Sequence, residues 1–177
     1  MQITVFGGSA PKPGSPAYLE AYSLGKMIGE AGQTAITGGY IGTMEAVSHG
    51  CAEAGGHVIG VSCDEIEAWR AVKPNQWVIE EIRKPTLHGR LLTLIEICDA
   101  AIALPGGVGT LAEIVIMWNL MQTKAITARP LILIGNGWRE SFKTIFDGQS
   151  AYIPPAHQDY LKFAVGVAAG FALLKAD

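Results

Sequence analysis

The sequence predicts an α/β protein of the Rossmann-like type, with a doubly wound, mostly parallel sheet flanked by helices, in a single domain over residues 1–177. Short β-branched runs alternate with helical stretches along the whole chain. These runs are apolar throughout instead of at every second residue, as expected of strands covered on both faces. No linker, repeat or change of composition divides the 177 residues, a length that fits one domain.

Seven runs are expected to form the strands. Each is rich in β-branched or other apolar residues, and most stop at a glycine. Five are Ile3–Gly8, Thr34–Gly39, His57–Ser62, Ala100–Gly107 and Pro130–Asn136, and two weaker candidates are Gln76–Ile82 and Leu161–Gly166. Helical patterns fill the spaces between them, near Pro16–Ala31, Gly42–Ala54, His88–Cys98, Thr110–Met121, Trp138–Asp147 and Val167–Lys175. Right-handed crossovers would then place helices on both faces of the sheet.

The composition favours a protein with extensive apolar burial and argues against a nucleic-acid-binding protein. Hydrophobic residues make up 49% of the chain and charged residues 16%, with a mean hydropathy of +0.28. Such a chain buries much of its surface, and we expect a homodimer or homotetramer that buries part of it between subunits. The formal net charge of −3 gives no basic surface, which argues against a nucleic-acid partner.

The sequence also predicts a cytoplasmic protein without a metal. Cys51, Cys63 and Cys98 lack a C-x-x-C spacing, which indicates reduced cysteines that pack in the core. No apolar run reaches the roughly 18–20 residues of a membrane span. The start MQITVFGGSA has no basic region before its apolar stretch, so we interpret it as a strand and not as a signal peptide. The histidines show no metal-ligand spacing with cysteine.

Three strand ends carry glycine and indicate a phosphate-binding edge of the sheet. Glycine lets the backbone approach a ligand closely, and the helix N-terminus that follows offers free N–H groups and a partial positive charge. Ligands of doubly wound sheets lie at this carboxyl edge. A tight turn without a ligand is the alternative for each loop. The predicted phosphate-binding residues are Gly8, Ser9, Gly38, Gly39, Gly42, Thr43, Gly106, Gly107, Gly109 and Thr110.

The loop Gly106–Thr110 matches neither the Walker A motif nor the G-x-G-x-x-G motif of dinucleotide-binding proteins. A ligand other than a hydrolysed nucleoside triphosphate or a dinucleotide is therefore expected. Thr110 is expected to cap the helix that follows. That helix carries Glu113 in its first turns, where the helix dipole stabilises a carboxylate that can face the loop. Glu45 occupies a similar position after the second glycine loop; for both acids, a helix-start residue with no further role is the alternative.

The stretch PGGVGTLAE, Pro105–Glu113, resembles the PGGxGTxxE motif of the LONELY GUY (LOG) family, whose members were formerly labelled lysine decarboxylases. VFGGSA resembles the first strand and serine-bearing loop of that family. TGGYIGTMEAVSHGCAEAGGHVIGV resembles its second glycine loop with the following helix and strand, and RKPTLHGRLLTLIEICDAAIALPGG resembles the segment with its arginine motif. The resemblance covers most of the chain.

This resemblance implies a nucleoside 5′-monophosphate phosphoribohydrolase, which hydrolyses the N-glycosidic bond to give free base and ribose 5-phosphate. It implies Arg90 and Glu113 as the catalytic pair, phosphate on the Gly106–Thr110 loop and a homo-oligomer. We expect that no cofactor is required. Cleavage of this bond develops positive charge on the ribose, which a carboxylate can stabilise while it orients water, and a fixed cation can clamp the phosphate or the leaving group. Pyridoxal phosphate chemistry is set aside, because no lysine lies near the expected pocket.

The arginine motif departs from the M-x-x-R-K pattern of the family. It reads Leu87-His88-Gly89-Arg90-Leu91, with leucine where methionine and lysine are expected, and so lacks a cation beside the expected phosphate. This keeps open a related branch, the molybdenum cofactor carrier proteins, which bind a phosphorylated pterin without turning it over. The alternative function is therefore a carrier of the molybdenum cofactor or of another nucleotide. Trp69 and Trp77 flank a segment, Asp64–Pro85, that could cover the pocket and stack a base; core or interface packing is the other expectation.

Overall fold

The computed structural model describes residues 1–174, and its seven strands form one sheet in the order β4-β3-β2-β1-β5-β6-β7. All neighbouring strands are parallel, so the predicted doubly wound sheet is confirmed and is parallel throughout. The strands are β1 (Gln2–Phe6), β2 (Thr34–Thr37), β3 (His57–Cys63), β4 (Glu80–Lys84), β5 (Ala100–Ala103), β6 (Leu131–Ile134) and β7 (Leu161–Ala164).

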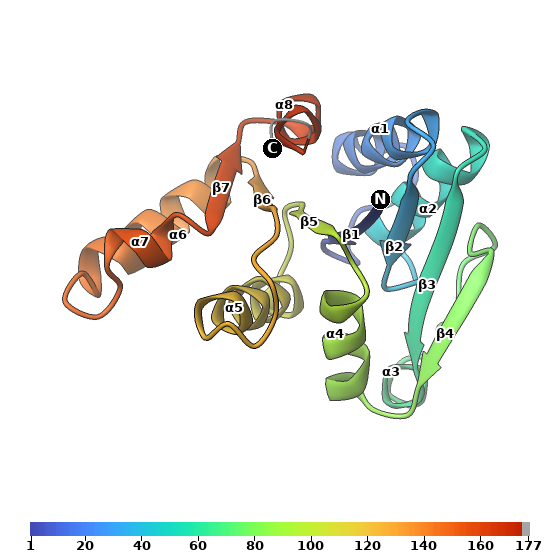
Figure 1. Cartoon of the computed structure of the whole chain (residues 1–177). Helices are drawn as coiled ribbons and strands as arrows, with labels where there is room; N and C mark the ends of the chain where they lie inside the picture. The colour runs from blue at the N-terminus through green and yellow to red at the C-terminus, as the bar shows by residue number, and fades with distance from the viewer. Residues whose placement is uncertain (175–177) are drawn as a thin grey trace.

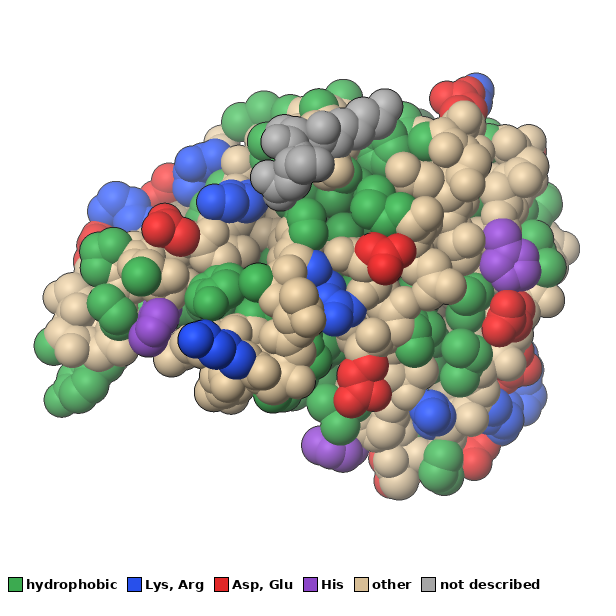
Figure 2. All heavy atoms as spheres, viewed as in Figure 1, with side chains coloured by type: hydrophobic (Ala, Val, Ile, Leu, Met, Phe, Trp, Pro, Cys, Tyr) green, Lys and Arg blue, Asp and Glu red, His purple; other side chains and the backbone are tan. Residues whose placement is uncertain are grey.

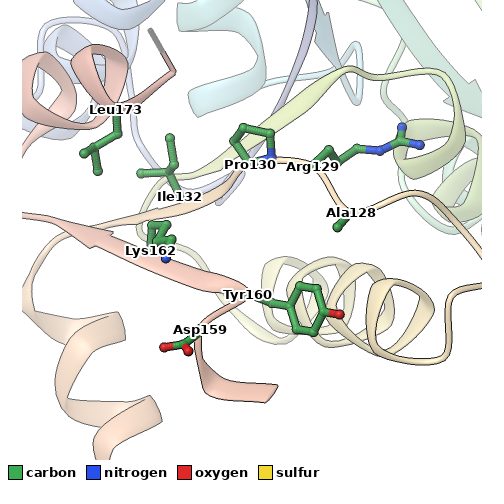
Figure 3. Close-up of a pocket in the computed structure, with 8 residues that line it drawn as sticks. All are labelled: Ala128, Arg129, Pro130, Ile132, Asp159, Tyr160, Lys162 and Leu173. Carbon is green, nitrogen blue, oxygen red and sulfur yellow. The ribbon is translucent and has the colours of Figure 1, made fainter. Parts of the chain in front are cut away.

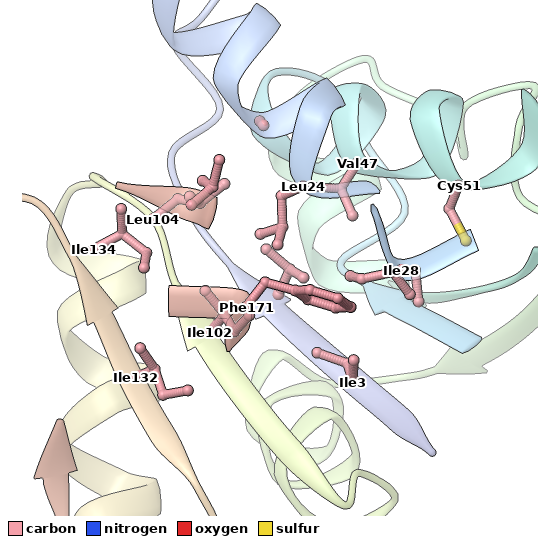
Figure 4. Packing of buried hydrophobic residues seen from close by; sticks show 14 of the residues in the cluster. Ile3, Leu24, Ile28, Val47, Cys51, Ile102, Leu104, Ile132, Ile134 and Phe171 are labelled. Atoms are coloured by element: carbon pink, nitrogen blue, oxygen red, sulfur yellow. The ribbon is translucent and has the colours of Figure 1, made fainter. Parts of the chain in front are cut away.

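Helices cover both faces of the sheet (Figure 1). One face packs against α1 (Pro16–Glu30), α2 (Thr43–Glu53) and α8 (Val167–Leu173), and the other against α4 (Leu87–Glu96), α5 (Val108–Gln122) and α6 (Asn136–Gly148). Figure 4 shows the first of these layers, in which side chains of α1, α2 and α8 meet the apolar side chains of the central strands. Burial of this apolar surface on both faces is the main stabilising contribution to the fold.

The chain reverses its direction of travel across the sheet at β1. From β1 it moves outward through β2 and β3 to β4, and it then returns to form β5 on the other side of β1. Phe6 and Ala103 pair at the carboxyl ends of β1 and β5, and Gly8 N donates to Pro105 O at 3.2 Å just beyond them. The loops after β1 and β5 therefore lie side by side at the switch point, where open α/β sheets bind ligands.

The observed elements differ from the predicted ones most clearly at the start of β4 and at two short helices. β4 begins at Glu80 and not at Gln76, because Asn75 forms a turn in which its side chain accepts from Trp77 N at 3.1 Å. Two short helices, α3 (Asp64–Trp69) and α7 (Pro155–Gln158), were not expected. The last predicted helix ends at Lys175, which lies outside the described residues. None of the helices within residues 1–174 is long and apolar enough to cross a membrane.

Candidate active site

A cavity of about 420 Å³ lies at the switch point of the sheet. Its walls come from the loop after β1, the α3 region, the first turn of α4 and the first turns of α5. The lining residues are Gly7, Gly8, Ser9, Tyr40, Met44, Ile66, Trp69, Arg70, Val72, Leu87, Arg90, Gly107, Val108, Gly109, Thr110 and Glu113. The cavity thus combines apolar side chains with a small number of charged groups, as is typical of small-molecule sites.

Arg90 is buried and held in one orientation by the backbone. Its Nε donates to Val61 O at 2.8 Å, and its Nη2 donates to Gly38 O at 3.2 Å. The guanidinium also lies 5.7 Å from the centre of the Tyr40 ring. A Cβ at position 38 would lie 1.8 Å from Arg90 Nη2, so this approach requires glycine there. Gly38 therefore acts by admitting the arginine, not by lining the cavity.

Glu113 lies beside Arg90 in the same cavity. Arg90 Nη1 is 3.9 Å from Glu113 Oε1, and the Glu113 side chain is 12% exposed. Neither carboxyl oxygen takes a hydrogen bond from the residues that the structure describes. Burial raises the pKa of Glu113 from 4.5 to about 7, although the positive charge of Arg90 partly opposes this rise. A buried carboxyl group with a pKa near neutrality is a feature that active sites share.

The glycine loops divide into residues that line the cavity and residues that shape it. Gly8, Ser9, Gly107, Gly109 and Thr110 line it together with Arg90 and Glu113. The remaining predicted residues do not line the cavity: Gly38, Gly39, Gly42, Thr43 and Gly106. Thr43, for example, donates from its N and its Oγ1 to Gly8 O at 3.0 and 2.9 Å and so fixes the loop after β1.

The N-terminus of α5 opens into the cavity without a side-chain cap from the described part of the chain. Its first backbone bond runs from Leu111 N to Gly107 O at 3.0 Å, which leaves the N–H groups of Val108, Gly109 and Thr110 without intrahelical partners. The expectation that Thr110 caps this helix was wrong, because the helix begins at Val108 and Thr110 is already its third residue. Free N–H groups and the helix dipole make this position suitable for a phosphate.

Several lining residues were missed in the sequence. Arg70 is the most informative of them, because it brings a second guanidinium to the cavity. Trp69 lines the mouth and is 74% exposed, as the covering-segment hypothesis predicted, whereas Trp77 stacks on His49 with ring centroids 4.1 Å apart. Glu45 does not line the cavity. The one signal in the sequence for a place of Arg70 in the cavity wall is its position next to Trp69, in the segment that was expected to cover the pocket.

A second cavity of about 420 Å³ lies at the amino ends of β6 and β7 (Figure 3). Its lining includes Arg129, whose Nη1 donates to Ile95 O and Glu96 O at the end of α4, at 3.3 and 3.4 Å. This arginine therefore satisfies helix carbonyl groups, and none of the predicted site residues lies in this cavity.

On the face in Figure 2, acidic and basic side chains are interspersed and are not separated by sign. No cluster of metal-ligating residues occurs among residues 1–174, and the expectation of a metal-free site stays a prediction.

Two glycine substitutions at the α5 loop are expected to have opposite effects. A Cβ at Gly109 meets no atom within 4 Å, so Gly109→Ala should leave stability unchanged or slightly raised. Gly109 lines the cavity, so if the loop binds phosphate as predicted, the added methyl group should hinder it, and we expect the affinity for inorganic phosphate to fall about tenfold or more. A Cβ at Gly106 lies 2.2 Å from Thr110 Oγ1, so Gly106→Ala should lower the melting temperature. Thermal unfolding and titration with inorganic phosphate test both, and wild-type affinity in Gly109→Ala would contradict a phosphate at this loop.

The parallel sheet, the cavity at its switch point and the buried arginine–glutamate pair define a Rossmann-like α/β protein with a ligand site at the carboxyl edge. The chain belongs to the SLOG cluster4 family (LDcluster4), whose model matches residues 1–145.

Two rice proteins confirm the resemblance to the LONELY GUY family. The cytokinin riboside 5′-monophosphate phosphoribohydrolase LOG of Oryza sativa subsp. japonica is 34% identical over 154 residues, which cover 82% of this chain and 60% of that protein. The probable cytokinin riboside 5′-monophosphate phosphoribohydrolase LOGL5 of the same plant is 32% identical over 154 residues, covering 82% of this chain and 59% of that protein. The chain thus spans about 60% of the length of these two relatives.

Among solved structures, the molybdenum cofactor binding protein from the phototrophic bacterium Rippkaea orientalis superimposes with a TM-score of 0.76. The two chains are 23% identical, and the match covers 99% of this chain and 95% of the other. At this identity the likeness establishes the common fold alone.

Proposed function

We propose that the protein is a nucleoside 5′-monophosphate phosphoribohydrolase, which cleaves the N-glycosidic bond to give free base and ribose 5-phosphate. The observation that carries the proposal is the Arg90–Glu113 pair, 3.9 Å apart in a cavity that also holds the open N-terminus of α5. The activity named for the rice relatives supports the same reaction.

Each group of site residues has a separate role in this reaction. The N–H groups of α5 and the glycine loop bind the 5′-phosphate and so fix the ribose in the cavity. Ionised Glu113 stabilises the positive charge that develops on the ribose, orients the attacking water and accepts its proton, while the departing base takes up a proton from solvent. Arg90 fixes the position of the carboxylate and lowers the cost of its charge. No metal or cofactor takes part in these steps, and turnover is expected to persist in the presence of a chelator.

The direct test is incubation with a panel of nucleoside 5′-monophosphates and chromatographic detection of released base. Release of base and ribose 5-phosphate in equal amounts is the expected result. The matching nucleosides, which lack the phosphate, serve as controls and are expected to react far more slowly, because they cannot use the α5 loop. Failure to release base from any of the nucleotides would refute the proposal.

The alternative predicted from the arginine motif, a carrier of a phosphorylated pterin such as the molybdenum cofactor, shares the phosphate loop but needs no chemistry. The solved molybdenum cofactor binding protein supports it only through the common fold. Leu87, at the motif position where methionine was expected, lines the cavity and adds apolar surface that suits a planar ring. Tight binding of a phosphorylated ligand without turnover is the result that would favour the carrier.

The pH dependence of the rate follows from the pKa of Glu113. If the ionised form is active, kcat/KM should rise with pH, level off above about 7, and fall roughly tenfold per unit well below it. The rate rises with pH because the carboxyl group loses its proton, and becomes the active carboxylate, as the pH rises through its pKa. Initial rates between about pH 5 and 9 measure this dependence. A rate that declines as the pH rises through 7 would instead assign the reaction to the protonated carboxyl, as a general acid.

We also propose that the protein is a homodimer or homotetramer. Apolar side chains occur all around α5, and Val115 on this helix is 40% exposed although Ile114, Met117 and Met121 are buried in the core. A second subunit over α5 would remove this apolar surface from water. Analytical ultracentrifugation at micromolar concentration should show a species of at least twice the chain mass of 18.7 kDa. A single species at the chain mass would contradict the proposal.

A further inference from the structure

The segment of residues 64–79, which we call the strap, forms one wall of the cavity and is fastened to the body of the protein. Asn75 Nδ2 donates to Gly39 O and to Tyr40 O, both at 2.9 Å. Glu67, whose side chain is 6% exposed, forms an ion pair with Arg83 of β4 at 2.9 Å, and a second one with Lys73 at 2.7 Å joins two positions of the strap itself. These contacts hold the strap at the mouth of the cavity.

Arg70 lies on this strap with most of its hydrogen-bonding capacity unused. Its Nη1 donates to Ser9 Oγ at 3.1 Å, and its guanidinium lies 4.3 Å from the centre of the Trp69 ring. Its Nε and Nη2 donate to no group within residues 1–174. Stacking on the tryptophan restricts the guanidinium to the cavity wall without occupying its N–H groups.

The residue that Arg70 touches lies next to the phosphate loop. Ser9 follows Gly8, whose N donates to Pro105 O at 3.2 Å, and a Cβ on Gly106 would lie 2.9 Å from Gly8 N. The free N–H groups of Arg70 and those of the α5 N-terminus therefore line one cavity, from two different walls. An anion between them would be bound by a charged fork on one side and by backbone N–H groups on the other, which is the arrangement that phosphate favours.

We propose that Arg70 is a phosphate-recognition residue of this site, which selects ligands that carry a 5′-phosphate. The proposal rests on the proposed function for the identity of the ligand, and it concerns binding and not the cleavage step. When the phosphate enters, the guanidinium donates to its oxygens through Nε and Nη2, which donate to no group within residues 1–174.

The test is calorimetric titration with ribose 5-phosphate, which carries the phosphate but has no N-glycosidic bond, so the result does not depend on turnover. Wild type, Arg70→Ala, Arg70→Lys and Arg139→Ala are compared. Arg139 is exposed, lies against Phe163 and does not line the cavity, so its removal controls for the loss of one positive charge. We expect Arg70→Ala to weaken binding about tenfold or more, Arg70→Lys to weaken it less, and Arg139→Ala to change it less than twofold.

Binding to Arg70→Ala within twofold of wild type would overturn the inference, as would an equal loss in Arg139→Ala or no binding of ribose 5-phosphate to wild type at millimolar concentration. Circular dichroism verifies that the variants fold. If Arg70→Ala does not fold, the affinity of Arg70→Lys compared with wild type decides the test. Phosphate binding that depends on Arg70, in a protein that releases no base, would support this inference and refute the hydrolase. Release of base by a protein whose phosphate binding does not depend on Arg70 would support the hydrolase and refute this inference.

Discussion

Glu113→Gln is expected to lower the turnover of nucleoside 5′-monophosphates by about a hundredfold or more and to retain most of the nucleotide affinity. Glutamine has nearly the same shape as glutamate but cannot carry the negative charge that stabilises the ribose cation in the transition state. Loss of one well-placed electrostatic group in a buried site has an effect of this order on kcat. The proposed phosphate site is formed by the α5 loop and not by Glu113, so the affinity should change little. Steady-state kinetics together with nucleotide titration measure the two quantities separately.

Glu45→Gln is the matched control for this substitution. Glu45 lies in the first turn of α2, as the sequence predicted, but it does not line the cavity. Glu45 is the third residue of α2 and Glu113 the sixth residue of α5, so Glu45→Gln removes the same charge near a helix start but away from the cavity, and it should leave turnover within about twofold of wild type. Equal turnover in wild type and Glu113→Gln would mean that Glu113 is not catalytic in this protein.

The stability of Glu113→Gln gives a second, independent measurement of the environment of this side chain. A carboxyl whose pKa rises on folding binds its proton more tightly in the folded state, so ionisation of the group destabilises the fold as the pH rises from about 4.5 to about 7. The difference between the two pKa values corresponds to a cost on the order of 3 kcal/mol above pH 7. Glu113→Gln should therefore be more stable than wild type at pH 8 in urea denaturation, and this difference should vanish near pH 4. A less stable variant at pH 8 would contradict the raised pKa.

The fold and the loops of the site could be predicted because their signals are local. Apolar runs that stop at glycine define strands by their own composition, and PGGVGTLAE places a loop and a helix start within nine residues. The pairing of Arg90 with Glu113 came from the family resemblance. The structure adds the reason for it, since bonds to Val61 O and Gly38 O turn the guanidinium toward the cavity.

The wall formed by the strap could not be predicted in the same way. Arg70 and Ser9 are 61 residues apart in sequence, and only the placement of α3 beyond β3 brings them together. The family motif places a second cation at position 91, where this chain has leucine, and residues 64–79 show no periodic pattern that would point to a cation there. The start of β4 could not be predicted either, because the turn at Asn75 that precedes it is held by hydrogen bonds to Gly39 O and Tyr40 O, which depend on the tertiary structure.

Arg90→Ala is expected to destabilise the protein by about 2–3 kcal/mol, because it removes a buried side chain whose guanidinium donates hydrogen bonds to two backbone carbonyl groups. The substitution removes the donors to Val61 O and Gly38 O and the positive charge 3.9 Å from Glu113 Oε1. Both carbonyl groups would lose a charged donor in a buried position, which is costly. Urea denaturation of the variant and of wild type at the same pH measures this loss, and equal stability would contradict the structural role of Arg90.

The same variant tests whether Arg90 acts on the ligand or through Glu113. Two of the guanidinium nitrogens are committed to backbone carbonyl groups, so we expect kcat to fall more than the nucleotide affinity. Without the arginine charge, the pKa of Glu113 should rise further above 7, and the residual activity should have its midpoint at a higher pH. Arg90→Lys, which keeps a charge but cannot donate to both carbonyls, should return the midpoint toward the wild-type value and restore only part of the stability. An affinity that falls as much as the rate, with no change in the pH midpoint, would instead place Arg90 in direct contact with the nucleotide.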